Sequence, residues 1–262
     1  MSTLTLAVRD SGTMLRRNLL HMRRYPSLTL MLIGVPVIIL LLFVYVFGGT
    51  LGAGLGPSGD RGDYANYVTP GILLITVASA AQGTAISVAM DMTEGIIARF
   101  RTMAIFRPSV LTGHVLGSVI QTMVSIAAVT GAALLVGFRP TATPLEWLAV
   151  FGVLTMITVA VTWLSVALGL VSESVETASN LPMPLVLLPF LGSGFVPTDS
   201  MPTAVRWFAD YQPFTPVMET LRGLLFGTGI GANAILAVAW CAVITVLCFL
   251  WAKALYNRSR AA

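Results

Sequence analysis

The side chains with the clearest potential for covalent chemistry are a serine and a histidine. Ser193 lies between Gly192 and Gly194, a setting similar to that of intramembrane serine proteases, which also need a base on a facing helix. His114 is the one candidate base. It lies near the cytoplasmic start of the third predicted span, which puts it on the opposite side of the bilayer from Ser193. We therefore expect no catalytic residue, and we assign Ser193 to close helix packing.

The sequence contains no recognisable nucleotide-binding or metal-binding pattern. The phosphate-binding motif G-x-x-x-x-G-K-[ST] is absent. His21 and His114 are the only histidines, and neither has a set of Cys, Asp or Glu at metal-ligand spacing. We expect no metal, no cofactor and no ATPase activity in this chain.

Neutral polar residues occur inside the predicted spans, where ionisable groups are scarce. By the boundaries given below, only His114 is an ionisable residue within a span. Ion-coupled transporters usually place Asp, Glu or Arg in the membrane, so this scarcity argues against coupling to protons or sodium. The polar residues can either join helices by hydrogen bonds or line a path for an amphipathic substrate. They are Gln82, Gln121, Ser79, Thr84 and Ser125.

The composition indicates an all-α integral membrane protein. Of 262 residues, 56% are hydrophobic and 10% charged, with a mean hydropathy of +0.87, whereas soluble domains carry about 25% charged residues. The net charge of +4 gives no reason to expect a nucleic-acid partner. Six apolar stretches predict transmembrane helices. They are 28–47, 68–90, 111–137, 147–171, 181–196 and 231–252, and the fifth should be broken by Pro182, Pro184 and Pro189.

The basic residues predict the orientation. Six crossings put both termini on one side, and eleven of the 15 basic residues fall there. The positive-inside rule therefore predicts that both termini are cytoplasmic. The eleven are Arg9, Arg16, Arg17, Arg23, Arg24, Arg99, Arg101, Arg107, Lys253, Arg258 and Arg260.

Residues 4–24 predict an amphipathic helix ahead of the first span. Arg9, Arg16 and Arg23 form its basic stripe, opposite a stripe of apolar residues. Such a helix should lie in the cytoplasmic interface, with its arginines towards lipid headgroups or a partner protein. It either anchors the first span or takes part in force transfer.

Residues 91–108 predict a short cytoplasmic helix. Asp91 and Glu94 have the spacing of a capping box, and apolar and arginine side chains follow, as in the cores of protein interfaces. The alternative is a helix that lies flat on the membrane. The docking residues in the first interpretation are Glu94, Gly95, Ile96, Ile97, Arg99, Phe100, Arg101 and Met103.

Residues 197–229 predict two short outer helices that lie in or re-enter the outer leaflet. Ser200 and Thr215 are the expected N-caps, and Gly227 suits the end of the second helix. Glu219 and Arg222 are three residues apart and can pair on one helical face. We expect this pair to hold the turn rather than to bind substrate.

Two Gly-x-x-x-Gly patterns allow close helix contacts. They begin at Gly48 and Gly113. The pattern alone does not distinguish packing within one chain from packing between chains.

Several stretches together resemble the permease subunits of type 2 ABC exporters, and within them the daunorubicin-resistance permease subfamily. One is DMTEGIIARFRTM at 91–103, continued by SVLTGH at 109–114. Another is LPFLGSGFVPTDSMP at 188–202, followed by QPFTPVMETLRG at 212–223. With FVYVFGG at 43–49, the resemblance covers nearly the whole chain. Many members have a proline-containing turn at the position of Met103 to Ile105.

This resemblance implies one permease domain over 1–262, with six transmembrane helices, an interfacial N-terminal helix, a coupling helix and two short outer helices. It also implies an ABC ATPase subunit that binds ATP and Mg and contacts the coupling helix, and a second permease chain, identical or paralogous.

We accordingly expect a non-enzymatic transport subunit in a bacterial plasma membrane. It would export a hydrophobic or amphipathic compound, such as a drug-like metabolite, an antibiotic or a lipid, by alternating access. The alternatives are a non-transporting membrane scaffold and an intramembrane hydrolase.

Overall fold

Five helices in the described part of the chain are long and apolar enough to cross a membrane. The structure is a computed structural model that describes residues 11–18, 20, 24, 26–52, 61–95 and 108–258. No strand occurs among these residues, so the predicted all-α class is confirmed. The five helices are Thr29–Gly52, Arg61–Thr93, Leu111–Val136, Pro144–Val171 and Asn233–Tyr256.

The first of these helices contains a wider stretch near its end. It consists of α2 (Pro26–Leu41), the π-helical η1 (Leu42–Phe47) and α3 (Gly48–Gly52). Leu41 and Gly48, which flank η1, both keep right-handed helical backbone angles. The predicted span at 28–47 is therefore part of a longer continuous helix.

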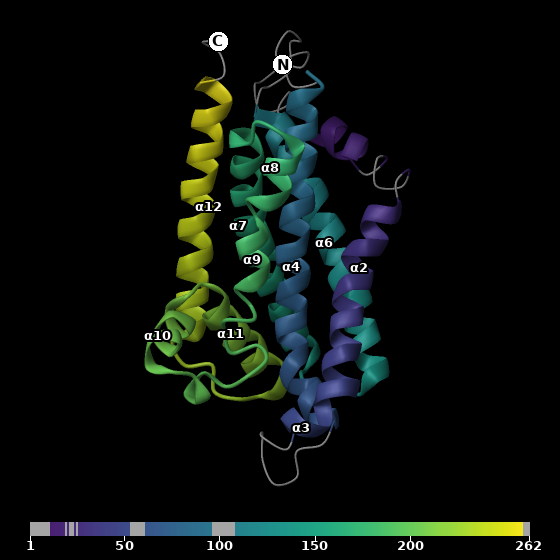
Figure 1. Cartoon of the computed structure of the whole chain (residues 1–262), viewed down its shortest axis with the longest axis vertical. Helices are drawn as coiled ribbons and strands as arrows, with labels where there is room; N and C mark the ends of the chain where they lie inside the picture. The colour runs from purple at the N-terminus through teal and green to yellow at the C-terminus, as the bar shows by residue number, and fades with distance from the viewer. Residues whose placement is uncertain are drawn as a thin grey trace.

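α4 (Arg61–Thr93) is the central helix. Figure 1 shows α2, α6 (Pro108–Val136) and α7 (Pro144–Val171) around it, and α12 (Asn233–Arg258) packs against α7. Most of the α4 side chains are buried as a result. Few side chains of α2 and α12 are buried, and both helices carry exposed apolar side chains, as helices that contact lipid do.

The helices run between two ends of the bundle. The end of α4, the start of α6 and the end of α12 lie at the end drawn uppermost in Figure 1, here called the upper end. The lower end holds α3 and the start of α4. The connection between α4 and α6, which contains the predicted docking segment, thus leaves from the upper end.

The predicted fifth span at 181–196 is not a continuous helix. α8 (Val175–Asn180) and α9 (Met183–Leu187) are separated by a turn, and turns continue from 188 to 195. In Figure 1 this broken segment (residues 175–196) descends from α8 near the upper end, through α9, towards the lower end. Prolines 182, 184 and 189 interrupt the helical hydrogen bonding, as their number predicted.

Two short helices follow the broken segment at the lower end. α10 (Thr203–Tyr211) is largely exposed, whereas α11 (Phe214–Phe226) is buried against α4, α7 and α12. α11 ends at Gly227, whose φ of +68° suits glycine.

The two predicted N-caps of these helices are wrong. Ser200 ends the 3-10 turn η3 (Thr198–Ser200), and α10 begins after Pro202. Thr215 lies inside the first turn of α11, which begins after Pro213. Both helices therefore follow a proline, and neither cap residue makes a side-chain capping hydrogen bond.

A glycine permits the close crossing of α4 and α7. A Cβ atom at Gly169 would lie 2.7 Å from the backbone oxygen of Ala85 and 2.9 Å from Cβ of Val88. Gly152, on the same helix, has nothing within 4 Å of its Cβ position. The chain thus offers one packed and one open glycine on α7.

Replacing Gly169 by valine should destabilise the protein, and replacing Gly152 by valine should not. Overpacking of a helix contact costs about 1–3 kcal/mol, which corresponds to a fall of roughly 3–10 °C in unfolding temperature. The measurement is thermal unfolding of the detergent-purified variants. Equal unfolding temperatures for the two variants would show that the contact of α4 with α7 leaves room for a side chain at position 169.

Candidate functional site

A buried carboxylate near the upper end joins three parts of the chain. Asp91, in the last turn of α4, accepts hydrogen bonds from Nη2 of Arg17 at 2.7 Å to each of its two oxygens. Nε2 of His114 lies 3.0 Å from its Oδ2, and an ionised carboxylate can only accept there. Asp91 and His114 are buried, whereas the Arg17 side chain is 37% exposed.

This position of Asp91 corrects two predictions. Asp91 is not the N-cap of a cytoplasmic helix, because α4 continues to Thr93. The membrane-length helices also carry more ionisable groups than His114 alone, since α4 extends beyond both ends of the predicted span at 68–90.

The first two predicted docking residues close α4. The N–H of Glu94 donates to the carbonyl of Met90 at 2.9 Å, and that of Gly95 to Met92 at 3.2 Å. Gly95 has a φ of +68°, as a residue that ends a helix often does. Ile96, Ile97, Arg99, Phe100, Arg101 and Met103 lie outside the described residues.

The helical residues 11–18 pack on α6. Met14 lies against Gly113, and a Cβ atom at Gly117 would be 2.9 Å from Cβ of Asn18. Asn18 also donates from Nδ2 to the carbonyl of Gly113 at 2.9 Å. The pattern that begins at Gly113 therefore mediates packing within the chain.

Only one residue of the predicted interfacial basic stripe can be placed. Arg16 is exposed on the helical residues 11–18. Arg9 and Arg23 lie outside the described residues. The contact of this stripe with lipid stays a prediction.

The two predicted path glutamines make separate interhelical hydrogen bonds. Gln82 of α4 donates to the carbonyl of Ser179 at 2.8 Å, and Gln121 of α6 donates to Oγ1 of Thr29 at 2.9 Å. Their partners lie on α8 and α2, which Figure 1 draws on different sides of α4. The structure thus uses both side chains to join helices.

The three smaller path residues lie in α4 and α6. Oγ1 of Thr84 is 2.5 Å from Oγ of Ser118 across the contact between these helices. Ser125 is buried, and its Oγ has no hydrogen-bond partner in the described part of the chain. Ser79 is half-buried.

A second polar cluster lies between α4, α11 and the broken segment. Arg222 forms an ion pair with Glu219 at 2.5 Å and donates from Nη2 to the carbonyl of Ser193 at 2.9 Å. Its guanidinium carbon lies 4.2 Å from the ring centroid of Tyr67, whose hydroxyl donates to the same Ser193 carbonyl at 2.9 Å. Arg222 thus contacts the two other elements as well as its own helix.

Carbonyls of the broken segment accept hydrogen bonds from side chains of other elements. Gln82 donates to the carbonyl of Ser179, while Tyr67 and Arg222 donate to that of Ser193. Gln212, which the sequence did not suggest as functional, is a second donor, at 3.0 Å, to the carbonyl of Leu188, which also accepts from the N–H of Leu191 at 3.1 Å. Side-chain donors of this kind can replace helical hydrogen bonds where no water is available, as in hydrocarbon.

The arrangement around Ser193 does not resemble a hydrolase site. Its Oγ contacts Sδ of Met218 at 3.7 Å, and His114 pairs with Asp91 near the other end of the bundle. No base therefore activates this serine within the described residues. Those residues also contain no group of three or more His, Cys, Asp or Glu that could hold a metal ion.

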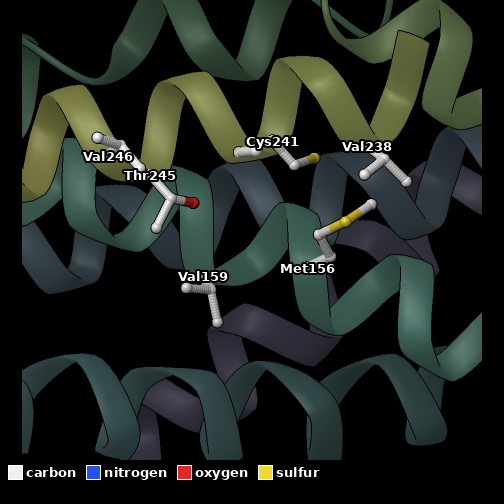
Figure 2. A pocket seen from close by; sticks show the side chains of 7 residues that line it. Met156, Val159, Val238, Cys241, Thr245 and Val246 are labelled. Carbon is white, nitrogen blue, oxygen red and sulfur yellow. The ribbon is translucent and has the colours of Figure 1, made fainter. Parts of the chain in front are cut away.

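An open apolar groove of about 300 Å³ runs between α7 and α12, and Figure 2 shows the side chains that line it. Thr245 is the lining residue that carries a hydroxyl group. The groove is lined almost entirely by apolar atoms, and none of the five predicted path residues lines it. The lining residues are Met156, Val159, Val238, Cys241, Ala242, Thr245 and Val246.

The sequence is similar to those of known membrane permeases. The family model of ABC-2 type transporters matches residues 10–226. A daunorubicin resistance ABC transporter permease protein of Streptomyces coeruleorubidus is 30% identical over 224 residues, which cover 85% of this chain and 77% of the relative. A probable doxorubicin resistance ABC transporter permease protein of Mycobacterium tuberculosis is 26% identical over 195 residues, covering 72% and 68%.

Replacing Arg222 by methionine should destabilise the protein. The change leaves Glu219 without its ion-pair partner and removes a donor from the Ser193 carbonyl, which together cost about 1–3 kcal/mol. Arg206→Met is the matched control, because its pair with Asp210 at 3.6 Å is exposed and exposed pairs contribute about 0–1 kcal/mol. Thermal unfolding in detergent measures both, and an equal effect of the two changes would contradict a structural role of Arg222.

Proposed function

Because the chain belongs to the ABC-2 type transporter family, and so is a membrane permease of an ABC transporter, we propose that it exports a hydrophobic or amphipathic compound. Drug-like metabolites, antibiotics and lipids are the candidate classes. The observation that carries this proposal is the similarity to two drug-resistance permeases over more than two thirds of the chain.

The energy would come from ATP and Mg²⁺ bound to a separate ATPase subunit. α4 ends and α6 begins at the upper end of the bundle, and the two helices flank the segment that contains Arg99, Phe100 and Met103. In this proposal the upper end faces the cytoplasm, as do both termini. Residues 94–103 then dock into the ATPase and pass its movement to α4 and α6.

The broken segment would be the sixth crossing. Its descent between the two ends of the bundle supports this proposal, as do the side chains of other elements that donate to its carbonyls. α10 and α11 would then lie on the outer side, with the buried α11 re-entering the membrane. Glu219 and Arg222 would hold α11 against the broken segment.

Transport would proceed by alternating access in a complex of two permease and two ATPase chains. The exposed apolar faces of α2 and α12 support contact with lipid and with a second permease chain. Gln82 and Gln121 remain the candidates that line the path. Their interhelical hydrogen bonds would have to rearrange when the helices move.

The docking assignment predicts that an ATPase subunit co-purifies with the chain from membranes. Arg99→Glu and Phe100→Asp should each reduce the bound ATPase about tenfold or more, since charge reversal or a buried charge disrupts an interface. Lys253→Glu is the control, because it makes the same charge change as Arg99→Glu at an exposed residue near the end of α12. Undiminished binding by both docking variants would contradict the assignment.

The path assignment predicts altered export without loss of assembly. Gln82→Leu and Gln121→Leu should each change the efflux of daunorubicin from vesicles that contain the permease and its ATPase. Co-purification of the ATPase serves as the control for assembly. Normal efflux by both variants would limit the glutamines to helix packing. The scaffold alternative would be favoured if the wild-type complex moved no compound and the permease did not stimulate ATP hydrolysis by the ATPase.

A further inference from the structure

Asp91 lies where three segments meet at the upper end of the bundle. It belongs to the last turn of α4, three residues before Glu94, and contacts His114 in the second turn of α6. These two helices are the stems of the predicted docking segment. Arg17 adds the N-terminal helical residues to the same carboxylate.

The N-terminal residues are fitted to this place by shape as well as by charge. Met14, Arg17 and Asn18 share one face of the helical turns, at spacings of three and four residues. Met14 and Asn18 contact the glycines of α6, and Arg17 pairs with Asp91 of α4. A side chain at Gly113 or Gly117 would occupy the space of this helix.

The charge pattern makes these contacts interdependent. Both oxygens of Asp91 are engaged, and its side chain is 9% exposed. A buried carboxylate that loses its partners is strongly unfavourable. A shift of α4 relative to α6 therefore either carries residues 11–18 along or breaks the cluster.

We propose that Asp91 is a positioning residue that fastens the N-terminal helix to both stems of the docking segment, so that the three move together when the ATPase engages. The proposal rests on the proposed function for the identity of the moving partner. Its geometric part, the fastening itself, does not depend on any ATPase.

Cysteine cross-linking tests the fastening. Asn18→Cys and Gly117→Cys, in a background with Cys241→Ala and Cys248→Ala, place two Cβ positions 2.9 Å apart. This is about 1 Å closer than in a disulfide, so residues 11–18 must move outward by that amount when the bond forms. Oxidation in membranes should cross-link this protein. Adding Asp91→Asn or Arg17→Met should lower the yield about fivefold or more, because the buried pair is broken.

Arg24→Met is the matched control for this experiment, since it removes the same charge from an exposed residue of the same N-terminal segment. It should leave the cross-linking yield unchanged, and Arg17→Lys should restore most of the yield lost in Arg17→Met. The fastening is refuted if the paired cysteines fail to cross-link, or if Asp91→Asn and Arg17→Met cross-link as well as the parent.

Coupled transport tests the role. In vesicles with the co-purified ATPase, Arg17→Met should keep the ATPase bound but lower the daunorubicin moved per ATP hydrolysed, and Arg17→Lys should recover it. If Arg17→Met lowered protein yield, ATP hydrolysis and transport in parallel, the Asp91 cluster would only stabilise the protein, and the proposed role in coupling would be refuted. Failure of the wild-type chain to bind any ATPase would instead refute the proposed function, and the cross-linking result would still stand.

Discussion

The structure depends on one constraint, which is that a backbone in hydrocarbon must find hydrogen-bond partners inside the protein. The long helices meet it within themselves. The broken segment, whose helical hydrogen bonding is interrupted, accepts hydrogen bonds from side chains of other elements, among them Gln82, Gln212 and Arg222. These side chains are what bind α4, α11 and the interrupted stretch into one unit, so the polar residues in the apolar interior have a common physical purpose.

Charged groups are concentrated towards the two ends of the bundle and serve different geometries there. At the upper end the Asp91 carboxylate contacts Arg17 and His114, which come from two other segments of the chain. At the lower end the Arg222 guanidinium contacts a carboxylate, a carbonyl and an aromatic ring. Between them, small and hydroxyl-bearing residues such as Gly169, Thr84 and Ser118 let the helices approach closely.

Hydropathy was sufficient to predict the membrane class, the all-α fold, the five long helices and the position of the proline breaks, because each is a property of a continuous stretch. The family followed from local motifs. The role of Asp91 could not be predicted, since Arg17 is 74 residues away in sequence and a local capping pattern gave a competing explanation. Gln212 was missed for the same reason, because its partner, the carbonyl of Leu188, lies 24 residues earlier in the broken segment.

The π-helical stretch in the first helix has a consequence for how that helix faces its neighbours. Pro36, Leu40, Val44, Gly48 and Gly52 are buried at intervals of four residues. In a regular α-helix such a row would turn by about 40° at each step and leave the contact within a few turns. The wider turns of Leu42–Phe47 reduce this rotation, so the buried positions from 36 to 52 stay on one side of the helix.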